Sequence, residues 1–97
     1  MFRHCVLMQF DEAATAMQRA GAVEGIQQLR DSVPGVLALA VGPDAGLGEG
    51  NFDLAVVADF ENSDAYEVYA SHPAHLEMLA EVVRPILAER AAVQFEI

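Results

Sequence analysis

Two stretches of alternating residues constrain the fold of this chain most strongly. In the stretch 2–10, the alternate positions hold Phe2, His4, Val6, Met8 and Phe10, with Arg3, Cys5, Leu7 and Gln9 between them. The stretch 51–60 has the same character, and in both stretches the centre is apolar on either side. Period-two alternation predicts strands. Apolar residues on both sides predict that both faces of the sheet are covered at its centre.

Two other segments have the spacing of amphipathic helices. The first follows the acidic pair Asp11-Glu12, ends at Pro34-Gly35, and turns these residues inward: Ala16, Ala20, Val23, Ile26, Leu29 and Val33. The second begins near Ser63, is broken at Pro73, and is loosened again at Pro85. Its two halves are expected to turn these residues inward: Ala65, Val68, Tyr69, Leu76, Leu79, Ala80, Val83, Ile86 and Leu87.

Short apolar or alternating runs at 36–41 and 92–97 predict two more strands. The glycine-rich segment 42–50 predicts a flexible connection, either a mobile lid or a hairpin loop without a role. The resulting order is β-α-β-β-α-β, so we expect one α+β domain over residues 1–97 with a ferredoxin-like fold. In this arrangement the helices cover one face of a four-stranded antiparallel sheet.

The other face of this sheet would carry Cys5, Leu7, Ala55 and Val57. Apolar residues make up 54% of the chain, which is more than a lone domain of 97 residues easily hides. An apolar sheet face needs a cover, and a second copy of the chain supplies one. We therefore expect a homodimer with apposed sheet faces.

The net charge of −10 disfavours nucleic acid and anionic membranes as partners. No apolar run approaches the length of a membrane span, and the N-terminal residues do not have the pattern of a secretory signal. Cys5 is the only cysteine and cannot form an internal disulfide. These features predict a cytoplasmic protein.

The segment 69–75, Tyr-Ala-Ser-His-Pro-Ala-His, is the strongest candidate for a functional site. Pro73 biases His72 out of the helical region, which predicts a corner between two helices with Tyr69 and His75 pointing inward. A neutral imidazole can take a proton near pH 7, and a phenol can donate a hydrogen bond to a substrate oxygen. The alternative is structural, with His75 bridging the corner and the Tyr69 hydroxyl bound to backbone.

The other two histidines point to less specific roles. His72 is expected to be a corner residue, and His4 is a lone histidine on an apolar strand face. Closed zinc sites usually add cysteine or carboxylate ligands at tight spacing, which is not found here, so no metal site is predicted. Acid–base chemistry by Tyr69 and His75 would also require no cofactor.

The whole chain resembles the stress-responsive A/B barrel (Dabb) family of dimeric α+β barrels. The resemblance rests on the segments 3–10, 33–36, 52–60 and, most specifically, 69–75. Some members of the family are stress-associated proteins without established chemistry. Others are polyketide cyclases of the olivetolic acid cyclase type, which close a poly-β-keto thioester by an aldol condensation. A related class of ferredoxin-like dimers, the antibiotic-biosynthesis and haem-degrading monooxygenases, commonly relies on a tryptophan, which this chain lacks.

By resemblance to the cyclases, Tyr69 and His75 form the acid–base pair and His4 lines the pocket. Leu54 stands where the plant cyclase has a further pocket histidine, so the substrate stays open. One hypothesis is a cofactor-free cyclase or isomerase for a small hydrophobic β-keto or aromatic compound. Its pocket would lie between sheet and helices, with the following walls: Val6, Leu54, Leu79 and Val83. The other hypothesis is a non-catalytic binding or stress-protective dimer. A cleft of about 300 Å³ or more that reaches Tyr69 and His75 would favour the enzyme.

Overall fold

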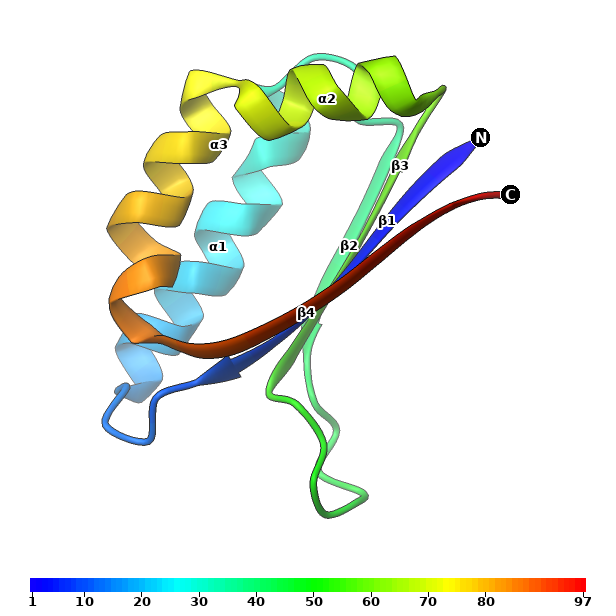
Figure 1. Cartoon of the computed structure of the whole chain (residues 1–97). Helices are drawn as coiled ribbons and strands as arrows, with labels where there is room; N and C mark the ends of the chain where they lie inside the picture. The colour runs from blue at the N-terminus through cyan, green and yellow to red at the C-terminus, as the bar shows by residue number, and fades with distance from the viewer.

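The computed structural model describes residues 1–97 and places all the helices on one face of an antiparallel sheet (Figure 1). The elements in chain order are β1 (Phe2–Phe10), α1 (Ala16–Ser32), β2 (Ala38–Pro43), β3 (Leu54–Phe60), α2 (Ser63–Ser71), α3 (Pro73–Met78) and β4 (Leu87–Glu96). A π-helical turn (Leu79–Val83) and a 3-10 turn (Arg84–Ile86) join α3 to β4. The four strands lie in the order β2-β3-β1-β4. The predicted ferredoxin-like β-α-β-β-α-β arrangement is therefore confirmed.

Several boundaries differ from the predicted ones for local reasons. Helix α1 begins after Thr15, and not at the acidic pair, because Thr15 and Gln18 form a capping box. The Gln18 N–H donates to Thr15 Oγ1 over 3.1 Å, and the Thr15 N–H donates to Gln18 Oε1 over 2.9 Å. The loosening expected at Pro85 is confirmed. The α-helix gives way to a π-helical turn before this residue, and Pro85 itself lies in the 3-10 turn that follows.

The last strand begins at Leu87, five residues before the predicted start at Ala92. Its first half, Leu-Ala-Glu-Arg-Ala, has no apolar alternation, because it lies at the edge of the sheet and all but the first residue are exposed. Antiparallel pairing with β1 extends from Phe2 opposite Glu96 to Phe10 opposite Leu87. Backbone pairing with a central strand therefore sets the length of β4, which side-chain pattern alone does not reveal.

The core lies between the helices and one face of β1 and β3. Val6 and Met8 of β1 lie beside Val56 and Leu54 of β3, and α1 covers them with Ala22 and Ile26. The predicted inward positions Ala16, Ala20, Val68, Leu76 and Ala80 are wrong, since all five are exposed. In α2 the inward positions belong to Tyr66 and Tyr69, three residues apart, so the face that carries Val68 turns toward solvent.

The opposite face of the sheet is not covered within the chain. We call it the open sheet face and define it by these residues: Cys5, Leu7, Ala55, Val57, Ala91, Val93 and Phe95. The side chains of Leu7, Val93 and Phe95 are 44%, 58% and 46% exposed. An ion pair crosses this face between Arg3 and Asp59, with nitrogen–oxygen distances of 2.7 and 2.9 Å.

The loop between β2 and β3 projects away from the helices (Figure 1). It turns at Gly46 and Gly50, whose φ angles of 78° and 77° favour glycine. The Asp44 carboxylate closes the loop by accepting hydrogen bonds from the Gly46 N–H and the Asn51 side chain. None of the helices has the length and apolar composition needed to cross a membrane.

Candidate functional site

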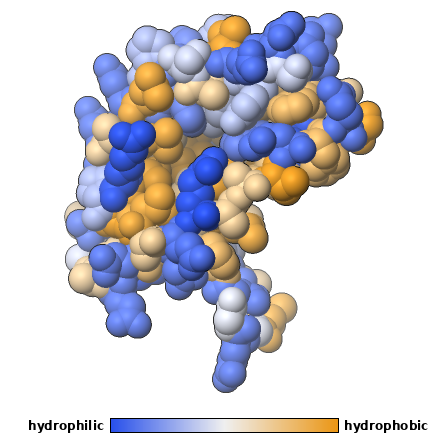
Figure 2. Space-filling model, viewed as in Figure 1, coloured by the Kyte–Doolittle hydropathy of each residue, from blue (hydrophilic) through white to orange (hydrophobic).

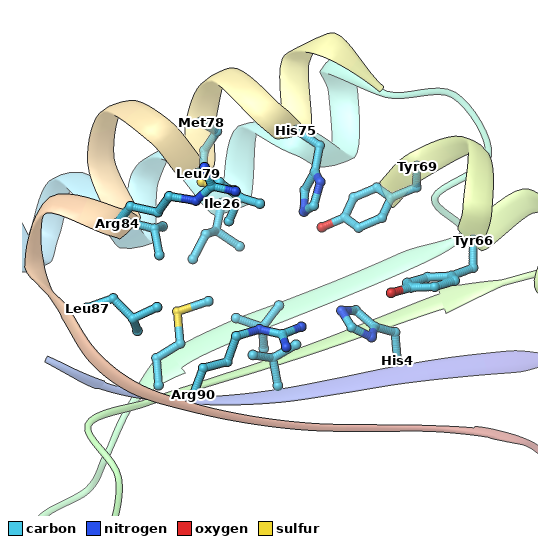
Figure 3. A pocket seen from close by; sticks show the side chains of 14 residues that line it. His4, Ile26, Tyr66, Tyr69, His75, Met78, Leu79, Arg84, Leu87 and Arg90 are labelled. Atoms are coloured by element: carbon cyan, nitrogen blue, oxygen red, sulfur yellow. The ribbon is translucent and has the colours of Figure 1, made fainter. Parts of the chain in front are cut away.

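A cavity of about 310 Å³ lies between the helices and the sheet. Strands β1 and β3 form its floor, α1 and α3 form its roof, and the corner between α2 and α3 closes one end (Figure 3). On the molecular surface it opens as an apolar hollow bordered by hydrophilic side chains (Figure 2). Ten of the 14 lining residues are hydrophobic, and the other four are His4, His75, Arg84 and Arg90. The cavity therefore joins an apolar body to a few basic groups.

The corner has the geometry that Pro73 predicts. His72 is extended, with φ −65° and ψ 136°, and Pro73 is the first residue of α3. The His72 side chain is the cap of α3, since its Nδ1 accepts a hydrogen bond of 3.1 Å from the Ala74 N–H. The rings of Tyr69 and His75 meet inside this corner with centroids 4.5 Å apart. Both rings line the cavity (Figure 3).

His75 is held in one tautomer by a backbone contact. Its Nδ1 lies 3.0 Å from the carbonyl oxygen of Ala70. A carbonyl only accepts, so Nδ1 carries the proton and Nε2 has a free lone pair. Burial lowers the pKa of His75, the backbone bond to Ala70 opposes this change, and the positive charge of Arg90 lowers the pKa further. The ring is therefore neutral near pH 7 and can accept a proton at Nε2.

Tyr69 presents a protonated hydroxyl to the same cavity. Its side chain is 3% exposed, and burial raises its pKa to about 12, with a smaller effect from Tyr66. This hydroxyl forms no hydrogen bond within the chain. Every fully buried polar side-chain atom has a partner, so the Tyr69 hydroxyl is not fully buried. The hydroxyl is therefore open to the cavity, and is not bound to backbone as the structural alternative requires. It can donate a hydrogen bond and cannot act as a base near neutral pH.

His4 lies on the floor of the cavity. Its Nδ1 is 2.8 Å from Nε2 of Gln94, an amide nitrogen that only donates, so the ring proton is on Nε2. Its ring packs against Tyr66 with centroids 4.8 Å apart. Burial lowers the pKa of His4 to about 4, and the charges of Arg90 and His75 act in the same direction. His4 is thus a neutral donor at physiological pH.

Of the predicted apolar walls, Val6, Leu79 and Val83 line the cavity, but Leu54 does not. Leu54 lies opposite Met8, one step further along the sheet than Val56, which lies opposite Val6 and does line the cavity. Leu54 instead borders a depression next to Val23 of α1. The register of β1 and β3 therefore keeps Leu54 out of the cavity. The functional roles of His4, Tyr69 and His75 stay predictions.

Three lining residues were not predicted from the sequence, namely Tyr66, Arg84 and Arg90. The spacing of Tyr66 and Tyr69 could have placed both on one face of α2. Arg90 shares a face with His4, which the sequence would show only if β4 were known to begin at Leu87. No sequence signal identifies Arg84.

No three histidine, cysteine or carboxylate side chains lie close enough together to hold a metal ion. No residue of the glycine-rich segment 42–50 lines the cavity in the structure.

The fold and cavity define a ferredoxin-like α+β protein with a site beneath its helices, and sequence comparison assigns the family. The chain belongs to the stress responsive A/B barrel domain family, Dabb, whose model matches residues 2–97. The resemblance noted from the sequence is therefore confirmed. A comparison with curated proteins found no match.

Solved structures share the same fold. A dimeric ferredoxin-like protein of unknown function from Thermobifida fusca is 36% identical, with a TM-score of 0.90, and the match covers 99% of this chain and 90% of that one. A dimeric protein of unknown function from Bacteroides fragilis is 23% identical, with a TM-score of 0.86 and coverage of 99% and 95%. A hydroxynitrile lyase from Passiflora edulis is 18% identical, with a TM-score of 0.87 and coverage of 99% and 92%. At the last two identities the likeness shows a common fold alone.

Proposed function

We propose that the cavity binds a small, largely apolar compound with an enolisable carbonyl group, and that Tyr69 and His75 catalyse its cyclisation or isomerisation. The observation that carries this proposal is a cavity of about 310 Å³ that reaches both side chains. This volume lies at the lower end of the range for small-molecule sites. A solidly packed corner, which would have favoured the non-catalytic hypothesis, would leave no room for a substrate.

The groups at the corner suit proton transfer without a cofactor. Nε2 of His75 would take the acidic proton from the carbon between two carbonyl groups of a β-keto compound. The Tyr69 hydroxyl would donate a hydrogen bond to the oxygen on which negative charge develops. The Nε2–H of His4 is a second donor on the cavity floor. A positioned base of this kind typically contributes about 10²–10⁴-fold to a rate.

Product formation from poly-β-keto thioesters tests this proposal. We expect His75→Ala and Tyr69→Phe to lower the cyclisation rate by about 10²-fold or more. His72→Asn is the matched control, because His72 caps α3 from outside the cavity and asparagine can also cap a helix. Equal product from the wild type and His75→Ala would remove the acid–base mechanism.

A non-catalytic small-ligand-binding or stress-protective role is the second candidate. It is favoured by the bond between His75 Nδ1 and the Ala70 carbonyl, which gives His75 a structural function at the corner. On this hypothesis His75→Ala would lower the melting temperature, and wild-type protein would leave every thioester unconverted. Rates and melting temperatures measured on the same variants separate the two candidates.

We also propose that the chain forms a homodimer through the open sheet face. The 36% identical protein from Thermobifida fusca is dimeric, and three apolar side chains of this face are more than two-fifths exposed in the isolated chain. Sedimentation at micromolar concentration is expected to give the mass of two chains. A monomer under these conditions would contradict the apposed-sheet arrangement.

A further inference from the structure

Two arginines reach over the cavity from opposite sides (Figure 3). Arg84 begins the 3-10 turn that follows the helical layer, and Arg90 lies on β4, opposite Met8 of the cavity floor. The helical roof and the edge strand therefore each supply one guanidinium to the same opening. Tyr69 and His75 lie at the corner end of the cavity (Figure 3).

The charges of these two arginines are not compensated within the chain. The protein has 15 acidic residues and only five basic ones. Arg3 pairs with Asp59 and Arg19 pairs with Asp53, whereas Arg30, Arg84 and Arg90 form no salt bridge, and of these three only Arg84 and Arg90 line the cavity. No carboxylate lines the cavity. In a chain of net charge −10, two unpaired cations over an apolar cavity are a local exception to the overall charge.

We propose that Arg84 and Arg90 form a subsite for the carboxylate of a small acid whose apolar or aromatic body fills the cavity. This inference rests on the proposed function, since it names the class of ligand that the same cavity would take. A guanidinium presents paired N–H donors that match the two oxygens of a carboxylate. The apolar lining accommodates an uncharged body. A second negatively charged group on the ligand would find no further cation, since Arg84 and Arg90 are the only ones that line the cavity.

The position of the subsite also orients the ligand. With its carboxylate bound by the two guanidinium groups, the body of the acid occupies the apolar part of the cavity beneath α3. Arg90 is close enough to His75 for its charge to lower the pKa of that ring, so the bound acid also lies within reach of the corner where the proposed proton transfer occurs. The arginines would thus bind and position the substrate, while the corner residues would act on it.

The test compares an acid with its uncharged counterpart by isothermal titration calorimetry. The probes are 4-butylbenzoate and 4-butylbenzamide, which share a body and differ in charge. We expect the wild type to bind the acid at least about tenfold more tightly than the amide. In the double variant Arg84→Gln/Arg90→Gln this preference should fall to about twofold or less. Arg30→Gln is the matched control, because Arg30 is exposed on α1 and does not line the cavity.

Three outcomes would overturn the subsite. These are equal binding of acid and amide by the wild type, a preference that persists in the double variant, and no binding of the acid at millimolar concentration. A third probe, 4-butylphenyl phosphate, identifies the anion. Tighter binding of the phosphate than of the carboxylate would contradict the assignment to acids. Failure of the subsite is distinguishable from failure of the proposed function, because His75→Ala would still lower the turnover of a neutral substrate by about 10²-fold or more.

Discussion

At the level of single residues, the two cavity histidines carry their ring protons on different nitrogen atoms. The Ala70 carbonyl fixes the proton of His75 on Nδ1, whereas Gln94 fixes the proton of His4 on Nε2. His75 therefore presents an acceptor and His4 a donor. This pairing allows one side chain to take a proton while the other stabilises an oxygen, provided that both rings stay neutral.

Arg90 contributes to this neutrality, since its charge lowers the pKa of both histidines after the larger effect of burial. Arg90→Gln removes the charge and keeps a polar side chain of similar reach. We expect the pKa values of His4 and His75 to rise in this variant, and NMR titration of the ring protons measures the change. Arg30→Gln should leave both values unchanged, because Arg30 is not among the charges that act on these rings. A variant in which neither pKa rises would contradict the electrostatic role of Arg90.

His4 should also make stability depend on pH. Its ring has a pKa of about 4 in the folded state against an ordinary 6.5, so the unfolded chain binds a proton that the folded chain refuses. Stability is therefore full above pH 6.5 and falls as the pH drops toward 4. We expect a loss of about 2 kcal/mol from this ring, allowing for the part of it that faces the cavity.

Urea unfolding at several pH values measures this loss. His4→Asn should reduce the slope between pH 6.5 and 4 relative to the wild type. The Arg3–Asp59 ion pair acts in a different range, since its carboxylate has a lowered pKa and loses its charge only in stronger acid. An unchanged slope in His4→Asn would contradict the assignment to His4.

At the level of elements, the sequence predicts well what local rules decide. The corner at Pro73 follows from the geometry of proline, and the full extent of β1 follows from alternation. The start of β4 and the exclusion of Leu54 from the cavity depend on strand pairing, which acts between distant parts of the chain. For the same reason the sequence does not place Arg90 at the cavity, whereas the local rule for Pro73 does place His75 there.

The contact between α1 and the second helical segment depends on Gly25. A Cβ atom at this position would lie 3.0 Å from Cγ2 of Val82 and 3.2 Å from Cγ of Met78, so the helices approach closely only because the side chain is absent. Gly21 has nothing within 4 Å of such an atom. The two glycines of one helix therefore have different roles.

This difference gives a matched pair of variants. Gly21→Ala should raise the free energy of unfolding by about 0.5–1 kcal/mol through helix propensity. Gly25→Ala should lower it by about 1 kcal/mol, since overpacking against a β-branched side chain outweighs the same gain. Chemical denaturation measures both changes. Equal stabilisation by the two substitutions would show that α1 and the π-helical turn are not in tight contact.

At the level of the whole molecule, the two faces of the sheet differ in what covers them. The helices and the cavity occupy one face, so a ligand can enter without disturbing the other. The open sheet face is crossed by the Arg3–Asp59 ion pair and otherwise presents mostly apolar side chains. Because the cavity lies on the opposite side, dimerisation through the open sheet face would leave its opening free.

Leu7→Glu tests this arrangement, since Leu7 lies on a central strand of the sheet. In an apposed dimer the substitution buries carboxylates that lack partners, so we expect the dissociation constant to rise by about a hundredfold or more. Leu47→Glu is the control, because it adds the same charge at a loop side chain that is already 93% exposed. Sedimentation velocity over a concentration series measures both constants. Equal dissociation constants for the two variants would exclude the open sheet face from the interface, and a folded Leu7→Glu monomer that still binds 4-butylbenzoate would show that one chain is sufficient to form the cavity.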